Sequence, residues 1–238
     1  MNENIKKTTK AFKVDLDSRE NQSILKSSTR CSNNQAHQIN EATKKIYELI
    51  KNAKHSNDGI VLNHNKIKEA FFSPFKPQLK NAQVFLSHSH ADINKALEVK
   101  DYLEEYLDAE CVFIDSLFWD YKDDVLNKLA EYDDISGIED VFTLILRESL
   151  ECMIKKCPYF VFLQSKNSVS NQGLSRNQDL LKITYSAWIY EELKIAHSIS
   201  ESRPIPMMES MQVFHDISLF LESFETITLK KLSQQINS

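Results

Sequence analysis

The strongest constraint on the fold is an alternation of short apolar runs with helical segments after residue 80. The runs that we predict as buried strands cover residues 83–87, 111–115, 159–163, 204–207 and 227–229. Apolar residues spaced three or four apart predict helices between them, at 93–107, 141–154, 187–198 and 211–220. Strands that alternate with helices form a parallel sheet covered on both faces, whose ligands bind beyond the carboxyl ends of the strands. We therefore expect an α/β fold with a five-stranded parallel sheet.

The chain before residue 81 has a different pattern. Residues 1–38 are polar with apolar residues of no clear period, and we expect a flexible arm there. Residues 39–80 are expected to form a mainly helical extension, because apolar residues recur at helical spacing from Ile39. The main domain is then expected over 81–238. Within it, the segment 116–140 is expected to be largely irregular, with some helical pattern around Val125–Leu129, and 165–185 is expected to be a polar loop.

Glycine is unusually scarce, and this limits the ways in which the chain could bind a nucleotide. The chain of 238 residues has only Gly59, Gly137 and Gly173, whereas average usage would give roughly 17. No two of these glycines are close enough for a dinucleotide fingerprint or a phosphate-binding loop. Any nucleotide must be held by side chains and ordinary backbone.

The charge and the cysteine content limit the kinds of binding partner and the cellular compartment that we expect for this protein. The chain has 29 Lys and Arg against 34 Asp and Glu, a net charge of −5, which argues against a nucleic-acid partner. The sequence has no run of about 18 apolar residues, so we expect no membrane span. Its N-terminus lacks the apolar core of a secretory signal. The four cysteines form no C-x-x-C pair and are expected to be reduced thiols. We therefore expect a cytoplasmic protein.

Candidate functional residues follow the first predicted strand, where residues 87–92 read S-H-S-H-A-D. The H-x-H-x-D pattern resembles the zinc signature of metallo-β-lactamase-fold hydrolases, in which His and Asp ligands hold metals that activate water. One observation argues against a metal-dependent hydrolase, because Ile93 stands where that signature has a further His. We therefore expect no bound metal. In the simpler alternative, Ser87 or Ser89 caps the next helix and the histidines are loop residues.

A second candidate site lies on the helix predicted at 187–198. Trp188 and Glu192 are four residues apart and project from the same helix face. From spacing alone, the alternative is a surface glutamate beside a tryptophan that packs in the core.

Four short motifs occur in a fixed order. They are V-F-L-S-H-S-H-A-D at 84–92, V-F-I-D at 112–115, Y-F-V-F-L-Q-S at 159–165 and S-A-W-I-Y-E-E-L at 186–193. Together they resemble a TIR (Toll/interleukin-1 receptor) domain of the bacterial type, over residues of about 82–230. The resemblance implies a flavodoxin-like sheet of strand order 2-1-3-4-5. It also implies cleavage of the nicotinamide–ribose bond of NAD+, which is then a substrate and not a cofactor.

The resemblance also assigns roles to individual residues. Glu192, four residues after the tryptophan, corresponds to the family's catalytic glutamate, and Glu191 is rotated about 100° away on the helix. The other residues expected to line the site or to open the loop over it are Ser87, His88, Ser89, His90, Asp115, Phe118, Trp119 and Trp188. Basic residues that could meet the phosphates are Lys166, Arg176 and Lys182.

As partners, the resemblance implies NAD+, further copies of the same chain, and a separate effector that responds to the product, in bacterial anti-phage defence of the Thoeris kind. The product expected is ADP-ribose or a cyclic isomer. The main alternative is a TIR module without catalytic activity that works by self-assembly.

Overall fold

The computed structural model describes residues 9–25, 36–52, 54–56, 59–61, 63–73, 80–107, 111–114, 116–131, 136–172, 181–200 and 215–237. Side chains are described for all of these except 36–41, 54–61, 116–121, 136–141, 171–172, 181 and 187. The chain divides into two compact units. The first comprises residues 1–31, 82–114 and 151–238, and the second comprises 32–81 and 115–150.

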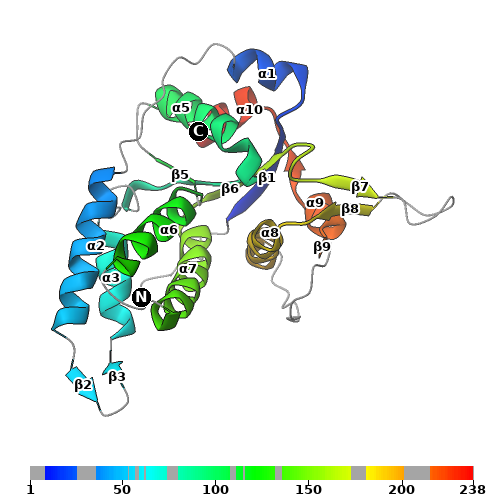
Figure 1. The fold of residues 1–238 in the computed structure, drawn as a ribbon. Coiled ribbons are helices and arrows are strands. Elements are labelled where there is room, and N and C mark those ends of the chain that lie inside the picture. The colour runs from blue at the N-terminus through cyan, green and yellow to red at the C-terminus, as the bar shows by residue number, and fades with distance from the viewer. Residues whose placement is uncertain are drawn as a thin grey trace, which may run out of the picture. The chain divides into compact units, whose positions relative to one another are not determined.

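The first unit is built on a five-stranded sheet in which every neighbouring pair is parallel (Figure 1). In spatial order, its strands are β10 (Glu225–Thr226), β1 (Lys10–Asp15), β6 (Tyr159–Gln164), β4 (Val84–Ser87) and β5 (Val112–Ile114). The expected α/β class with a five-stranded parallel sheet flanked by helices is confirmed, and the arrangement is compatible with a flavodoxin-like fold.

The strand order differs from the expected 2-1-3-4-5 in one place. The first three expected strands are β4, β5 and β6, and they stand in the order 2-1-3. Beside β6, where the fourth strand was expected, lies β1 from the N-terminal segment, paired along its whole length from Lys10 opposite Tyr159 to Asp15 opposite Gln164. The expected strand at 204–207 lies outside the described residues. The last strand of the sheet, β10, is just before the expected 227–229.

The expectation of a flexible arm over residues 1–38 is therefore wrong for residues 10–25. Phe12, Val14 and Leu16 are buried at alternate positions along and just after β1, as a strand with one face on the core requires. Helix α1 (Arg19–Leu25) follows at once, because the Ser18 hydroxyl accepts a hydrogen bond from the amide of Asn21 and caps the helix.

Helices cover both faces of the sheet in the first unit. Figure 1 shows α1, α5 (Ile93–Leu107) and α10 (Leu229–Ile236) on one face, with α8 (Ala187–Ser200) and α9 (Ser218–Ser223) on the other. The short 3-10 helix η2 (His90–Asp92) leads into α5. Aromatic side chains fill the core, where Phe85 stacks on Phe160 with ring centroids 5.7 Å apart.

The segment 165–185 is more regular than expected. It contains β7 (Ser170–Gln172) and β8 (Leu181–Thr184), which pair in antiparallel fashion. The strand β9 (His215–Asp216) extends this second sheet. The helix expected at 211–220 is therefore wrong at these two residues, and α9 begins only at Ser218, while residues 211–214 lie outside the described residues. Helix α10 follows β10 near the C-terminus.

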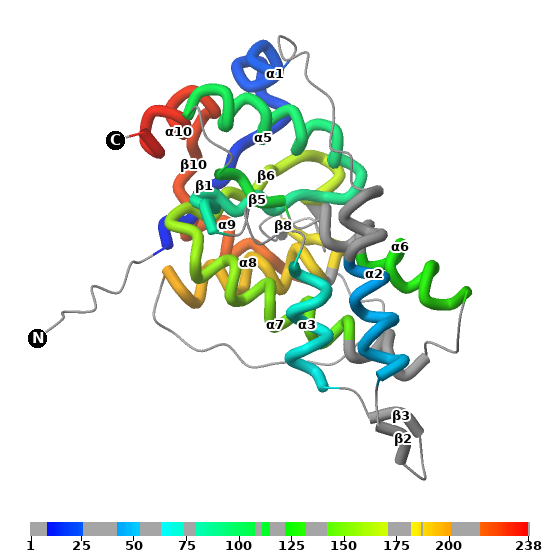
Figure 2. The backbone as a smooth tube through the Cα atoms, turned by 90° about the vertical axis from the view of Figure 1, so that its left-hand side faces the viewer, coloured from blue at the N-terminus to red at the C-terminus, as the bar shows by residue number. Residues whose placement is uncertain are grey.

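The second unit is helical. It contains α2 (Ala36–Lys51), α3 (His64–Phe72), α6 (Ser116–Ala130) and residues 136–150 of α7 (Ser136–Lys156), with a hairpin of β2 (Lys54–Ser56) and β3 (Gly59–Val61). Helices α2 and α3 lie side by side (Figures 1 and 2). The expectation of a largely irregular segment over 116–140 is wrong, because α6 and the start of α7 occupy most of it.

Contacts of the second unit include an aromatic pair and an exposed charge cluster. The rings of Phe71 and Phe142 meet edge to face with centroids 5.0 Å apart. Hydrogen bonds from His64 and Lys68 to the Glu148 carboxylate lower the pKa of that carboxyl group.

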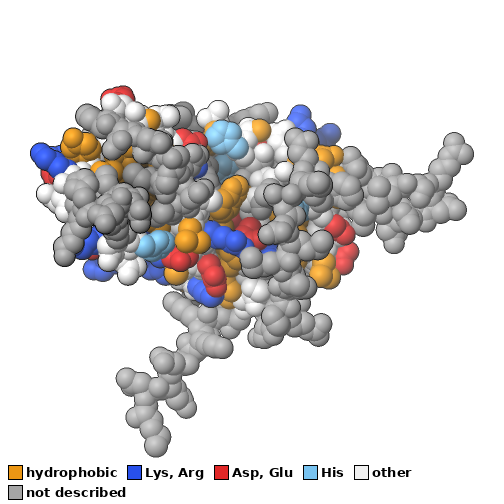
Figure 3. All heavy atoms as spheres, turned by 60° about the horizontal axis from the view of Figure 1, so that its bottom comes forward, with side chains coloured by type: hydrophobic (Ala, Val, Ile, Leu, Met, Phe, Trp, Pro, Cys, Tyr) orange, Lys and Arg blue, Asp and Glu red, His pale blue; other side chains and the backbone are white. Residues whose placement is uncertain are grey.

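On the face drawn in Figure 3, basic and acidic side chains are interspersed. None of the helices in the described ranges is both long enough and apolar enough to cross a membrane.

Candidate functional site

The structure brings Ser87 and Glu192 together. Ser87 is the last residue of β4, at the carboxyl edge of the sheet, and Glu192 lies on α8. The Ser87 hydroxyl donates a hydrogen bond to Glu192 Oε2, although the two residues are 105 positions apart in the sequence. Neither residue has exposed surface. A carboxylate that is buried and held by a hydroxyl donor at this edge of a parallel sheet defines the candidate site.

Helix α8 positions Glu192 through its N-terminal cap. The Ser186 hydroxyl accepts a hydrogen bond from the amide of Ile189, and the Ser186 carbonyl accepts one from the amide of Tyr190. Trp188 is half-buried in the first turn of α8. It stands four residues before Glu192, a spacing that sets both side chains on one face of the helix. The serine that begins the S-A-W-I-Y-E-E-L motif thus fixes where the helix begins.

Glu191 has a different environment from its neighbour. It is half-buried, and its carboxylate lies 3.7 Å from the Lys194 ammonium, an ion pair between residues three apart on the helix. Lys194 also lies over the ring of Tyr190 at 5.9 Å. The pKa of Tyr190 is raised, by burial first and then by the charge of Glu191. The two adjacent glutamates therefore lie in distinct settings, one in the core of the unit and one near its surface.

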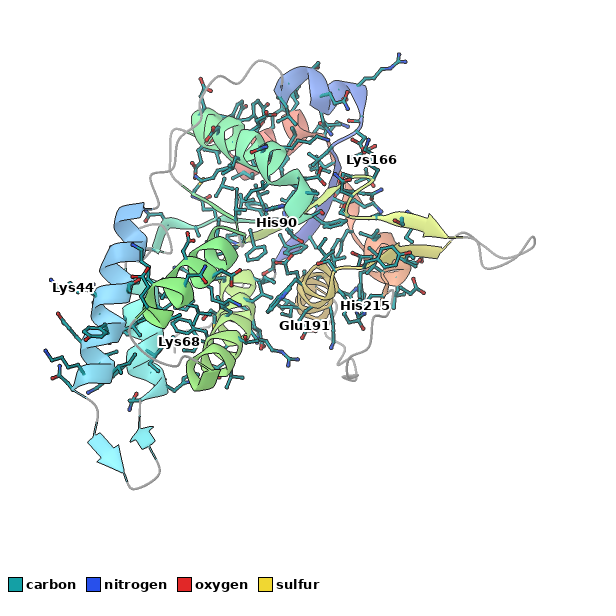
Figure 4. All side chains as sticks on the ribbon, viewed as in Figure 1. Lys44, Lys68, His90, Lys166, Glu191 and His215 are labelled. Carbon is teal, nitrogen blue, oxygen red and sulfur yellow. The ribbon has the colours of Figure 1, made fainter. Side chains whose placement is uncertain are left out.

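The residues after Ser87 are only partly buried. His88 is buried, and its Nδ1 lies 2.7 Å from the Ser89 carbonyl oxygen. Ser89 is half-buried, and its carbonyl accepts from the amide of Asp92. His90 is exposed where η2 begins (Figure 4). Ser89 makes no side-chain cap at the start of η2, and the hydrogen bond that the Ser87 hydroxyl makes is the one to Glu192 rather than one to a helix amide.

Asp92 ties the segments after β4 and β6 together, a role that the sequence analysis did not assign. It is 3% exposed. Its Oδ2 accepts from the Ser165 hydroxyl, and its Oδ1 accepts from the Asn167 amide at 2.9 Å. Lys95 Nζ lies 3.9 Å from Oδ1 and 3.4 Å from Asp17, so the segment after β1 joins the same network.

This network bears on the metal-hydrolase alternative. Both carboxylate oxygens of Asp92 accept hydrogen bonds from Ser165 and Asn167, which competes with metal ligation. Within the described ranges, no three His, Cys, Asp or Glu side chains are grouped so that they could hold a metal ion. The H-x-H-x-D segment is therefore better explained as the start of a hydrogen-bonded loop than as a ligand set.

Four further residues expected at the site cannot be placed beside it. Asp115 and Arg176 lie outside the described residues, and Phe118 and Trp119 belong to α6 with side chains that are not described. Of the lysines expected to meet phosphates, Lys166 is exposed and its amide donates to Asp17, while Lys182 is half-buried on β8. Lys166 and Glu191 are labelled in Figure 4.

No family model, no curated protein and no solved structure matches this chain.

Proposed function

We propose that this chain is a TIR-type enzyme that cleaves the nicotinamide–ribose bond of NAD+, with Glu192 as its catalytic residue. The observation that carries the proposal is the hydrogen bond from Ser87 to Glu192. It joins the first and last of the four motifs, which no local sequence preference would bring together. It also sets the Glu192 carboxylate at the carboxyl edge of the sheet, where ligands of open α/β folds bind.

The chemistry needs only one carboxylate. The nicotinamide ring of NAD+ is cationic, so it departs as a neutral molecule without a general acid. Positive charge develops on the ribose as an oxocarbenium ion, and a carboxylate beside the anomeric carbon stabilises that charge or binds the ribose hydroxyls. The hydrogen bond from Ser87 restrains the Glu192 carboxylate, and Trp188 stands one helical turn before it, at a spacing that sets both on one helix face.

Glu192 has no exposed surface, so the substrate must first open a path to it. The Ser87 hydroxyl, which donates to the carboxylate, is replaced or joined by a ribose hydroxyl when the substrate binds. Opening of this kind is a common step in enzymes that exclude water from their reactive centre. We expect turnover by an isolated chain to be slow, and to rise when self-association favours the open form.

The resemblance further suggests ADP-ribose or a cyclic isomer as the product. The same resemblance points to a cytoplasmic enzyme of bacterial anti-phage immunity, whose product signals to a separate effector. In that setting NAD+ is the substrate, and the chain needs no bound cofactor.

Incubation of the full chain with NAD+, followed by mass spectrometry, tests the activity and identifies the product together. Release of nicotinamide with ADP-ribose or its cyclic isomer is the expected result, at a rate that increases with protein concentration. No turnover over a wide concentration range, including conditions that cluster the chain, would favour an assembly module without catalytic activity.

A further inference from the structure

Lys13 lies in the same row of the central sheet as Ser87. In the strand register, Lys13 of β1 is opposite Phe162 of β6, and Phe162 is opposite Ser87 of β4. Residues in one row of a parallel sheet project from the same face, and two strand spacings separate the ends of this row by about 10 Å. Lys13 therefore belongs to the face on which Ser87 meets Glu192.

The backbone of Lys182 and the side chain of Lys13 both form hydrogen bonds with residues at or just before α9. The Lys182 carbonyl accepts from the amide of Ile217 at 2.9 Å, and the Lys182 amide donates to the Ser218 hydroxyl at 2.9 Å, at the start of α9. Lys13 Nζ donates to the carbonyl oxygen of Leu221, less than one helical turn further along. Two lysines from different strands thus approach the same short helix.

The positive charge of Lys182 acts unfavourably on the ammonium group of Lys13. Among the residues that the structure describes, no carboxylate forms an ion pair with either lysine, and both are half-buried. The pKa of Lys13 is lowered, by burial first and then by the charge of Lys182, and Glu222 opposes this shift. A bound anion would relieve the repulsion between the two lysines.

We infer that Lys13 and Lys182 form an anion subsite that receives the diphosphate of a dinucleotide bound with its reacting ribose at Glu192. The identity of the dinucleotide rests on the proposed function, but the anion chemistry does not. In NAD+, one ribose with its 5′ carbon separates the scissile bond from the diphosphate. The length of this ribose unit, added to the length of a lysine side chain, is enough to bridge the distance of about 10 Å between Ser87 and Lys13.

The test measures binding and kinetics separately, in the full chain. The variants are Lys13→Gln, Lys182→Gln and the double change, and the matched control is Lys10→Gln. Lys10 is an exposed lysine in the same strand, but its position along the strand places it on the opposite face. The binding probe is inorganic diphosphate, measured by calorimetry. The kinetic probes are NAD+ and nicotinamide riboside, which has the same scissile bond and no phosphate.

We expect each single change to weaken diphosphate binding about tenfold, which is the usual range for losing one charge-assisted hydrogen bond. The double change should raise KM for NAD+ at least tenfold and leave KM for nicotinamide riboside unchanged. Lys10→Gln should behave as wild type throughout. If Lys13→Gln unfolds the chain, Lys182→Gln decides the question, because that residue lies outside the central sheet.

The outcomes separate this inference from the proposed function. If diphosphate binding depends on both lysines but NAD+ is not cleaved, the anion subsite stands and the proposed activity fails. If NAD+ is cleaved and the variants bind diphosphate and NAD+ as wild type does, the subsite is overturned and the activity stands. Absence of diphosphate binding to the wild-type chain, or an equal loss in the Lys10 control, also overturns the subsite.

Discussion

At the scale of single residues, the hydrogen bond between Ser87 and Glu192 should contribute measurably to stability. Both side chains are fully buried, and removing either one leaves the other polar group in the core without this contact. In a double-mutant cycle of Ser87→Ala and Glu192→Ala, we expect a coupling energy of about 1–3 kcal/mol in the free energy of unfolding. Urea denaturation measures it.

The control cycle pairs Ser87→Ala with Glu191→Ala. Glu191 lies beside Lys194 rather than Ser87, so this cycle should give a coupling energy near zero. Equal coupling in the two cycles would contradict the assignment of Glu192 as the partner of Ser87.

Asn21 makes a second long-range contact with a testable effect. It is buried, its side-chain amide donates to the Asp15 carbonyl at 2.8 Å, and its carbonyl oxygen accepts from the Leu229 amide at 3.0 Å. It thereby joins the end of β1 to the start of α10. Asn21→Ala should lower the free energy of unfolding by about 1–3 kcal/mol, because backbone groups lose their partners.

The exposed Ser23 on the same helix provides the comparison. Ser23→Ala should change the free energy of unfolding by less than about 0.5 kcal/mol. Similar effects from the two substitutions, measured by urea denaturation, would show that Asn21 does not join β1 to α10.

The sequence predicts part of the site from local spacing. The four-residue interval between Trp188 and Glu192 sets both on one helix face, and the end of the first apolar run identifies Ser87 as an edge residue. The contact between Asp92 and Ser165 cannot be predicted from the sequence, because the two residues are 73 positions apart and many serines could take that place. The alignment of Lys13 with Ser87 across the sheet cannot be predicted either, because it depends on the register in which the strands pair.

At the scale of elements, β1 should behave as an integral part of the sheet. Phe12 is 2% exposed and lies beside Tyr159, with ring centroids 6.3 Å apart. Phe12→Ala should lower the free energy of unfolding by about 3–5 kcal/mol, as for other buried aromatic residues. Lys10→Ala in the same strand is the matched control, since Lys10 is exposed. An N-terminal segment that is not docked would give no effect from either substitution.

A local signal for β1 exists, because Phe12, Val14 and Leu16 alternate with charged residues as a half-buried strand requires. This run of alternating residues is short and lies among polar residues, so it is weak evidence for a strand by itself. The pairing of β1 with β6 depends on tertiary structure, and no local sequence pattern predicts it. Beyond the pattern around Val125–Leu129, the sequence does not predict the helices of 116–140, because acidic residues interrupt the apolar spacing, although packing of α6 against α2 compensates.

At the scale of the whole molecule, two buried thiols should make stability fall at alkaline pH. Burial raises the pKa of Cys111 to about 11 and that of Cys157 to about 12, from an ordinary value of 9.0. Above pH 9.0 the unfolded chain loses these protons first, so it binds fewer protons than the folded chain and stability falls as pH rises towards the folded pKa values. Below that range both states are protonated and the effect vanishes.

The measurement compares wild type with Cys111→Ala and Cys157→Ala combined. Between about pH 8 and about pH 10, the wild type should lose more free energy of unfolding than the double variant. Parallel pH profiles would show that the thiols are not buried in the folded chain. The exposed Cys152 is the internal reference, and Cys152→Ala should leave the profile of the wild type unchanged.

The central claim is that Glu192, and not its neighbour, is the carboxylate that acts on NAD+. The most direct measurement is the rate of nicotinamide release by Glu192→Gln and by Glu191→Gln, at the same protein concentration and with folding checked by circular dichroism. Glu192→Gln should reduce the rate at least about 100-fold, because the stabilising charge in the transition state is lost. Glu191→Gln should retain most of the activity. Equal rates for Glu192→Gln and wild type, or a selective loss in Glu191→Gln, would contradict the account.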